Sequence, residues 1–333
     1  MKHASIPIFI PMQGCLFDCV YCNQHHVTGQ TVELRDQEIR QIIENHLETL
    51  SVKDSRIEIA FFGGSFTALP RDRQRHYLEL VRPCLEHNRV DGIRLSTRPD
   101  YIDSATLCML QEYGVQTIEL GVQSMDDRVL ELSGRGHTAE DVRLAAALIK
   151  DSGFSLALQM MPGLPGDTLE KSMHTAAEII ALGAEATRIY PTLVIRNTRL
   201  AELYRNNTYS PLTLDEAVLW CSLIVPVFEK AGVHILRLGL HPSDGLLHGH
   251  EMLAGPFHVA FGELVYSEIW HNIFMEITPD QSKGVAIAVH PRQLNHAIGH
   301  KSKNKNMLRE KFRSVRFETD HSLSSRNFTI SYY

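Results

Sequence analysis

The feature that most constrains the fold is a regular alternation of short apolar runs with amphipathic segments from residue 6 to about residue 240. Short β-branched runs that alternate with helical patterns are typical of consecutive βα units around a parallel sheet. We expect at least six such units. The predicted strands are Ile6–Ile10, Arg56–Phe62, Gly92–Thr97, Gln116–Gly121, Phe154–Met160 and Ala186–Tyr190, with a further short run at His234–Leu238. The predicted helices are about 33–50, 71–88, 103–113, 138–152, 168–182 and 213–231.

The ends of these helices carry local signals. Thr138 and Thr213 each precede an acidic residue by three positions, which is the pattern of a capping box at a helix start. Five glycines fall where a helix should end and a strand begin, as expected of C-cap glycines. They are Gly92, Gly114, Gly153, Gly183 and Gly232.

Six or more βα units without a dinucleotide-binding fingerprint favour a barrel over a doubly wound sheet. The sequence therefore predicts an α/β protein with a partial (β/α)6 TIM-like barrel. After about residue 250 the pattern changes: an apolar segment at 262–276 precedes a strand at 284–290, a helix at about 292–313 and a strand at 315–319. We expect a core barrel at 1–245 and a small α+β C-terminal extension at 246–333.

Three of the six cysteines, Cys15, Cys19 and Cys22, lie within eight residues directly after the first predicted strand. Three thiolates so close together favour a metal site. A tetrahedral zinc site needs a fourth ligand, whereas a cubane 4Fe-4S cluster on three cysteines keeps one iron open for an outside ligand. A zinc knuckle or a redox thiol pair remains the alternative, because His25 or His26 offers a fourth ligand.

Composition bounds the setting of this chemistry. With 333 residues, of which 44% are hydrophobic, the chain has room for a sizeable core. No stretch has the character of a secretion signal or membrane anchor, so a cytoplasmic protein without membrane contact is predicted. The other cysteines, Cys84, Cys108 and Cys221, are expected to be buried small hydrophobic residues rather than a disulfide framework. The formal charge of −6 argues against a surface built for generic nucleic-acid binding but leaves room for a local basic patch.

Polar and glycine-rich segments follow the predicted strands, where active sites of barrels collect. The second strand ends in Gly63-Gly64-Ser65-Phe66-Thr67, in which paired glycines let the backbone approach a ligand closely. Leu95-Ser96-Thr97-Arg98-Pro99-Asp100 ends the third strand, and Gly121-Val122-Gln123-Ser124 ends the fourth. Gly134-Arg135-Gly136-His137-Thr138 leads into a helix, and the fifth strand ends at Gln159 before Met160-Met161-Pro162-Gly163-Leu164-Pro165-Gly166.

The cysteine spacing with Tyr21 before the last cysteine resembles the radical S-adenosylmethionine (radical SAM) superfamily. The strand-end motifs, over roughly residues 5 to 240, resemble the subgroup of Elp3-like proteins (the elongator catalytic subunit) and oxygen-independent coproporphyrinogen oxidases. The Gly-Gly-Ser-Phe-Thr, Thr-Arg-Pro-Asp and Arg-Gly-His-Thr elements are nearer the Elp3 side. The residues that follow the barrel are too few for the acetyltransferase domain of true elongator subunits, so acetyl transfer is not expected of this sequence.

The resemblance implies a 4Fe-4S cluster on Cys15, Cys19 and Cys22, and S-adenosyl-L-methionine (SAM) on the open iron. By the same resemblance, Gly63 and Gly64 would hold the SAM amine. The remaining expected SAM contacts divide by the part of the cofactor that they face. They are Ser96 at the methionyl end, Arg135 on the carboxylate, Gln123 and Gln159 at the ribose, and Tyr21 and Ser65 beside the cluster and the glycine pair. The implied activity is reductive cleavage of SAM to a 5′-deoxyadenosyl radical, with an electron donor such as flavodoxin or ferredoxin.

The substrate is not readable from these motifs. Residues 300–316 carry seven cations against one acid, which indicates either a solvated helix face or a contact with RNA such as tRNA. Histidines at 241–258 and the segment 255–264 are expected to line a substrate cavity, and a second metal there is the less favoured alternative because no H-E-x-x-H spacing occurs.

Three other functions stay open at this point. A tetrapyrrole enzyme resembling coproporphyrinogen oxidase is disfavoured by the short lead of fourteen residues before Cys15. A non-catalytic iron-sulfur or haem carrier, or an RNA-binding protein with a structural cluster, is disfavoured by the presence of both the glycine pair and Arg135, because such a protein needs no grip on SAM.

Overall fold

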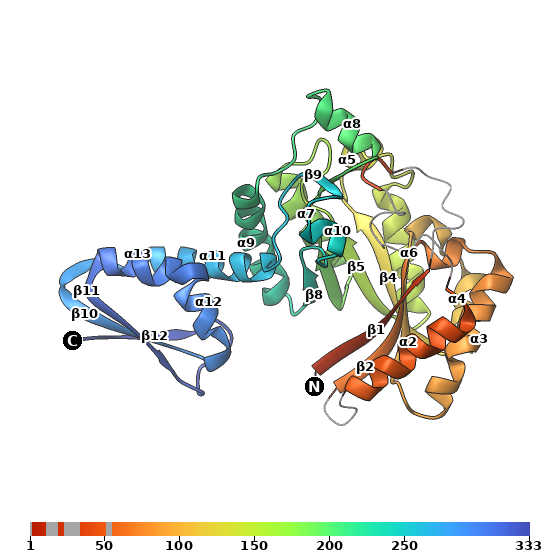
Figure 1. Ribbon diagram of the computed structural model, residues 1–333, viewed down its shortest axis with the longest axis horizontal. Coiled ribbons are helices and arrows are strands. Elements are labelled where there is room, and N and C mark those ends of the chain that lie inside the picture. The colour runs from red at the N-terminus through yellow and green to blue at the C-terminus, as the bar shows by residue number, and fades with distance from the viewer. Residues whose placement is uncertain (1, 11–18, 23–33, 51–54) are drawn as a thin grey trace. The chain divides into compact units, whose positions relative to one another are not determined.

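The computed structural model describes residues 2–10, 19–22, 34–50 and 55–333. The chain divides into two compact units (Figure 1). The first comprises Met1–Leu212 and Val227–Pro256, and the second comprises Thr213–Pro226 and Phe257–Tyr333.

The first unit is built on a parallel sheet of seven strands in the order β1-β2-β3-β4-β5-β6-β8. The strands of this sheet lie side by side in the order of the sequence, which is the arrangement of a barrel wall rather than of a doubly wound sheet. The predicted partial (β/α)6 barrel is therefore confirmed, with all seven predicted strands present. The strands are β1 (Lys2–Ile10), β2 (Ser55–Gly63), β3 (Gly92–Thr97), β4 (Val115–Gln123), β5 (Ser155–Met160), β6 (Ala186–Ile189) and β8 (His234–Leu238).

Helices that connect successive strands of this sheet pack on one of its faces (Figure 1). Strand alternation directs Ile57, Ile59 and Phe61 of β2 to that face, where all three are fully buried. The Phe61 ring lies 6.0 Å from the ring of Tyr77 in α3. The helices are α2 (Asp36–Thr49), α3 (Arg71–Glu86), α4 (Ser104–Glu112), α5 (Asp127–Leu132), α6 (Ala139–Asp151), α7 (Leu169–Ala181), α8 (Arg199–Arg205) and α10 (Asp244–Leu247), while α9 (Leu214–Lys230) spans the boundary between the units.

Most of the predicted helix ends are found. Thr138 accepts a hydrogen bond from the backbone of Asp141, whose carboxylate accepts one from the Thr138 amide. Four of the five glycines take positive φ values of 73° to 79° after their helices. Gly92 is the exception: it begins β3, and Asn88, with φ of 53°, takes the left-handed conformation after α3 instead. Asparagine tolerates that conformation better than most residues, so the glycine was not needed there.

The opposite face of the sheet carries a buried ionic network across β2, β3, β4 and β6. Arg94 donates to Glu58 (2.7 Å) and to Glu119 (2.8 Å). Arg188 donates to the second oxygen of Glu119 at 2.7 Å, and its guanidinium stacks on the Phe62 ring at 4.9 Å. Glu58 and Glu119 are no more than 3% exposed, so each carboxylate depends on its arginine partners for solvation.

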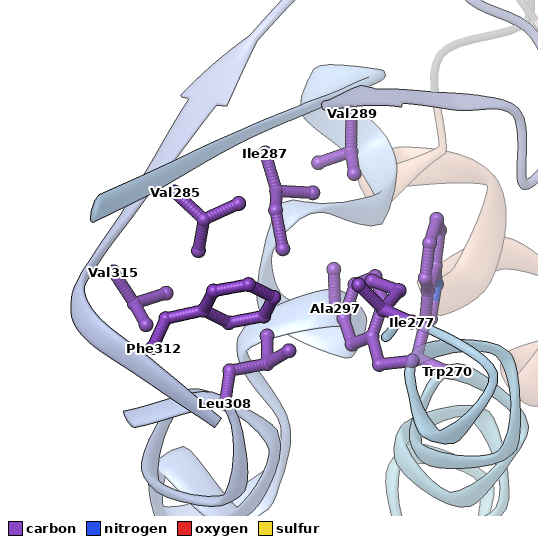
Figure 2. Packing of buried hydrophobic residues seen from close by; sticks show 10 residues of the cluster. Trp270, Ile277, Val285, Ile287, Val289, Ala297, Leu308, Phe312 and Val315 are labelled. Carbon is purple, nitrogen blue, oxygen red and sulfur yellow. The ribbon is translucent and has the colours of Figure 1, made fainter. Parts of the chain in front are cut away.

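The second unit contains a three-stranded sheet in the order β11-β10-β12, whose apolar residues pack against helices (Figure 2). Val285, Ile287 and Val289 alternate along β10 and are fully buried against Trp270 and Phe312. The elements are α11 (Phe261–Met275), β10 (Asp280–Val289), α12 (Leu294–Ile298), α13 (Lys303–Lys311), β11 (Phe312–Thr319) and β12 (Phe328–Tyr332). The short β7 (Val194–Ile195) and β9 (Met252–Ala254) pair in the first unit.

Two predictions for this region need correction. The helix expected at about 292–313 is broken, because Lys301 and Ser302 have positive φ values of 50° and 62°. The chain is already extended from residue 312, so Arg313 and Arg316 lie on β11 and not on a helix. The antiparallel strand β12 was not predicted. Among the described residues, no helix has the length and apolar character that crossing a bilayer requires.

Candidate functional site

Cys19 and Cys22 lie on a tight turn that two backbone contacts hold in place. The amide of Cys22 donates to the carbonyl of Cys19 at 2.9 Å. Between them, Val20 donates to the Ser133 carbonyl and accepts from the Leu200 amide. The Val20 side chain is 2% exposed and packs against residues of β7 and α8, so apolar packing positions the cysteine turn. Cys15 lies outside the described residues.

Two buried guanidinium groups approach the sulfur of Cys19. Arg135 Nη1 lies 3.6 Å and Arg98 Nη1 lies 3.9 Å from the Cys19 Sγ. Arg135 is anchored on its other side by a hydrogen bond from Nη2 to the Gly121 carbonyl. Both arginines are at most 7% exposed, and such cations in a poorly solvated place need an anionic partner. Asp100 meets that need for Arg98, whose Nε lies 2.8 Å from the Asp100 carboxylate, and the sulfur of Cys19 is the group nearest to Arg135 Nη1.

Near Cys19, burial and neighbouring charges shift the pKa values of Arg135 and His137 in opposite directions. Burial alone would lower the pKa of Arg135, but Tyr21 and Cys19 beside it raise that pKa above its usual value, so the guanidinium is a permanent cation. Burial, with the neighbouring Arg135 and Arg98, lowers the pKa of His137 to about 3. His137 is therefore a neutral imidazole at physiological pH, and its Nε2 lies 3.3 Å from the Val122 carbonyl.

Tyr21 precedes the last cysteine, and its buried hydroxyl lies within hydrogen-bonding reach of the Cys19 side chain. Burial raises the pKa of this phenol above its usual value. The Nε of Arg135 is buried without a partner in the described part of the chain. An unpaired buried donor is costly, and this one beside Cys19 indicates a place that a bound polar group completes.

The glycine pair lies at the carboxyl ends of β1 and β2. Gly63 has φ of 107°, and a Cβ there would collide with the Ile10 carbonyl oxygen. The Gly64 amide donates to the same oxygen at 3.3 Å. Only glycine fits this crossing, which joins the end of the strand that leads to the cysteines with the end of β2. A ligand amine is a donor, so backbone carbonyls are what this turn would offer it.

The two predicted ribose residues, Gln123 and Gln159, are brought together. Gln159 Nε2 lies 3.2 Å from Gln123 Oε1, and Gln123 sits at an irregularity of β4 with φ of 69°. Gly121 leaves room for Gln123 beside Arg135. A Cβ at position 121 would lie 2.8 Å from both Arg135 Nη2 and Gln123 Nε2. The absence of a side chain at this position lets a cation and an amide converge on one point of the strand end.

The two predicted serines occupy strand ends but are less closely tied to the cysteine turn. Ser96 is half-buried near the end of β3, and Ser65 begins the short turn 66–68 without capping it through its side chain. The hydroxyl contact at the third strand is made by Thr97, whose Oγ1 lies 2.6 Å from Thr67 Oγ1. That bond fastens the Gly-Gly-Ser-Phe-Thr segment to β3.

These residues fit an iron-sulfur site with a bound amino acid cofactor. Cysteine sulfur, guanidinium groups directed at it and an unpaired buried guanidinium nitrogen are the groups that a three-cysteine cluster and a ligand carboxylate would use. Among the described residues no three His, Cys, Asp or Glu side chains gather in a metal-binding group, and the third expected cysteine is not among them.

Sequence reasoning missed the contact between Arg98 and Cys19 and the ionic network of the barrel interior. The network had a signal in the sequence: Glu58, Arg94, Glu119 and Arg188 are each charged residues inside otherwise apolar strands. No signal in the sequence shows which arginine pairs with which glutamate, because these residues lie on strands that are far apart in sequence. The scattered cysteines also differ from expectation, since Cys84 and Cys221 are buried but Cys108 is exposed.

The basic segment after residue 300 is less open than its composition suggests. Lys303 pairs with Glu268 at 2.6 Å, and Lys311 Nζ donates to the carbonyls of Met275 and Ile277 at the end of α11. Arg316 stacks on the Tyr333 ring at 4.9 Å. In the histidine-rich segment, Glu251 accepts from Ser243, and His258 Nδ1 accepts from the Ala260 amide.

Comparison with known families identifies the class of enzyme to which this fold belongs. The family model "Radical SAM superfamily" matches residues 9–179, and the model "Radical_SAM C-terminal domain" matches residues 184–271. The chain therefore belongs to the radical SAM superfamily and is an enzyme of that superfamily. Membership implies a 4Fe-4S cluster and SAM.

Within the superfamily, the chain is similar to Elongator complex protein 3 of Dictyostelium discoideum, with 32% identity over 56% of this chain and 37% of the relative. It is 30% identical to the tRNA uridine(34) acetyltransferase of Methanocaldococcus jannaschii over 55% of this chain and 38% of that protein. The chain thus matches less than two fifths of the length of these relatives. The solved structure of Methanocaldococcus infernus Elp3 with an N-terminal deletion shares the fold, with a TM-score of 0.66 and 24% identity over 84% of this chain and 69% of that one.

Proposed function

We propose that this enzyme binds a 4Fe-4S cluster through Cys15, Cys19 and Cys22 and cleaves SAM reductively, and that the product radical acts on an RNA substrate. The observation that supports it best is the convergence of Arg135, Gln123 and Gln159 beside Cys19 at the carboxyl ends of the strands. A carrier or a structural cluster has no use for such a set of ligand-binding side chains around a thiolate.

Different residues of the chain would bind the carboxylate, the amine and the ribose of SAM. Arg135, held by the Gly121 carbonyl, would pair with the SAM carboxylate through its unpaired Nε, since a guanidinium fork matches a carboxylate. Carbonyls of the Gly63–Gly64 turn would accept from the SAM amine, and the paired amides of Gln123 and Gln159 would bond the ribose hydroxyls. When bound, the cluster supplies one electron, taken from a donor such as flavodoxin or ferredoxin, that breaks a carbon–sulfur bond of SAM.

Anaerobic reconstitution tests this activity. The wild-type protein with iron and sulfide should take up about four irons per chain and, with a strong reductant and SAM, should release 5′-deoxyadenosine and methionine. Cys19→Ala should lose the cluster absorbance and the cleavage, whereas Cys108→Ala, which changes an exposed cysteine outside the site, should keep both. Stoichiometric zinc without iron after reconstitution would refute the proposal.

The RNA substrate is supported by two independent features. One relative acts, by its name, on uridine 34 of tRNA. The second unit of this chain carries Lys301, Lys305 and Arg309 at intervals of four residues, with Lys301 and Arg309 exposed. On α13 the four-residue interval puts Lys305 and Arg309 on one helix face, so their charges add along one line of the surface.

Filter binding of bulk tRNA over a salt series tests this part. The logarithm of the binding constant for tRNA should fall linearly with the logarithm of the salt concentration. Exchange of Lys301, Lys305 and Arg309 for Glu should abolish tRNA binding without loss of SAM cleavage. Lys311 is left unchanged because it caps α11. The matched control exchanges the exposed Arg35, Arg82 and Arg128 for Glu, with the same change in net charge. Equal loss in both triple variants, or no binding by the wild type at low salt, would contradict an RNA contact at α13.

A further inference from the structure

The contact of Arg98 with Cys19 has no part in the binding scheme above. The Arg98 side chain is 2% exposed and uses every nitrogen of its guanidinium. Nε and Nη2 donate to the two oxygens of Asp100 at 2.8 and 2.9 Å, and Nη2 also donates to the Arg135 carbonyl at 2.6 Å. Nη1 alone points to the Cys19 sulfur, at 3.9 Å.

The local sequence locks this geometry. Arg98 is extended, with φ of −91° and ψ of 151°, as residues before proline usually are. Pro99 opens a single helical turn, which brings the Asp100 carboxylate back toward Arg98. The fork of two parallel bonds then fixes the plane of the guanidinium, so that Nη1 has one direction left. The bond to the Arg135 carbonyl ties the same group to the loop that carries the second cation.

We propose that Arg98 is a positioning residue that raises the reduction potential of the cluster through Cys19, and that Asp100 limits this effect. The inference rests on the proposed function, because it needs Cys19 as a cluster ligand. One-electron reduction makes the cluster and its thiolates more negative by one charge, so a cation with an N–H directed at a ligand sulfur stabilises the reduced state. Burial strengthens the effect, since water screens little at this depth.

Substitutions at Arg98 and Asp100 should shift the reduction potential of the cluster in opposite directions. Arg98→Met removes the positive charge and leaves the Asp100 carboxylate, so the potential should become more negative. Asp100→Asn keeps the cation and removes its counter-charge, so the potential should become more positive. Arg98→Lys keeps a charge near the sulfur and should remain closer to the wild type than Arg98→Met does. General damage to the site would not move the first two variants in opposite directions.

The experiment is a potentiometric titration without SAM, followed by the electron paramagnetic resonance signal of the reduced cluster. Iron content and visible absorbance first establish that each reconstituted protein holds its cluster. Arg98→Met should lower the equilibrium constant of reduction at least tenfold, which corresponds to a potential more negative by about 59 mV for a one-electron couple. Arg128→Met, at an exposed ion pair, serves as the control and should titrate as the wild type does.

The outcomes separate this inference from the proposed function. Equal potentials in Arg98→Met, Asp100→Asn and the wild type, or shifts of the same sign, would overturn the role of Arg98 while leaving SAM cleavage intact. A wild-type protein that holds no cluster would overturn both. If Arg98→Met fails to take up iron, Asp100→Asn decides alone: a more positive potential supports the inference, and an unchanged or more negative one refutes it.

Discussion

The change Glu119→Gln tests whether the ionic network stabilises the barrel interior. Glu119 is 3% exposed and accepts from Arg94 at 2.8 Å and from Arg188 at 2.7 and 3.1 Å. Glutamine keeps the volume but carries no charge and turns an N–H donor toward an arginine. Removal of one partner from a buried ion pair costs about 3–5 kcal/mol.

The structure favours the lower end of that range. Arg94 retains two bonds to Glu58, and Arg188 retains its contact with the Tyr190 hydroxyl and is 14% exposed. We therefore expect a loss of about 3 kcal/mol in the free energy of unfolding. The control is Glu140→Gln, whose carboxylate pairs with Arg143 at 3.3 Å with 65% of its side chain exposed, and which should cost less than about 0.5 kcal/mol.

Urea unfolding of both variants, followed by far-UV circular dichroism on the cluster-free protein, gives the comparison. The pH dependence is a second check. Burial alone would raise the pKa of Glu119, but Arg188 and Arg94 hold it below its usual value. A depressed folded-state pKa contributes stability above the unfolded value of about 4.3, and this contribution is lost as the pH falls through the folded value. The difference between wild type and Glu119→Gln should therefore shrink only in acid. Equal costs for the two variants at neutral pH would refute the reasoning.

Two further predictions concern single cations. Arg135→Ala should keep the cluster but weaken SAM binding by about 2 kcal/mol or more, because a charge-assisted pair at a buried site is lost. Calorimetric titration with SAM measures this loss, with the exposed-site variant Arg128→Ala as the control. Unchanged affinity for SAM would mean that the SAM carboxylate binds elsewhere. Lys311→Ala should lower the free energy of unfolding by about 1 kcal/mol, since the Lys311 Nζ caps the carbonyls at the end of α11. Urea unfolding followed by the fluorescence of Trp220 and Trp270 should show a lower midpoint for Lys311→Ala than for Lys305→Ala, and equal midpoints would argue against the cap.

Much of the barrel could be read from the sequence because its signals are local. All seven strands and the principal helices of the barrel follow from apolar periodicity, and four of the five glycines end helices because a left-handed residue is needed at each. The errors lie where local signals are weak. The break at Lys301 and Ser302 falls in a strongly polar helical pattern, and β12 is stabilised by its pairing with β10 rather than by its own composition.

The candidate site divides in the same way. The sequence by itself determined the cysteine spacing, the glycine pair and the polar residues at strand ends, because each is a contiguous motif whose chemistry needs no distant partner. Only the tertiary structure decided that Arg98 and Arg135, 79 and 116 residues away from Cys19, direct their guanidinium groups at one sulfur. It also decided which arginine balances each buried glutamate. Both depend on parallel strands and their following loops meeting at one edge of the sheet, where burial removes water and leaves each charge only the partners that the fold brings to it.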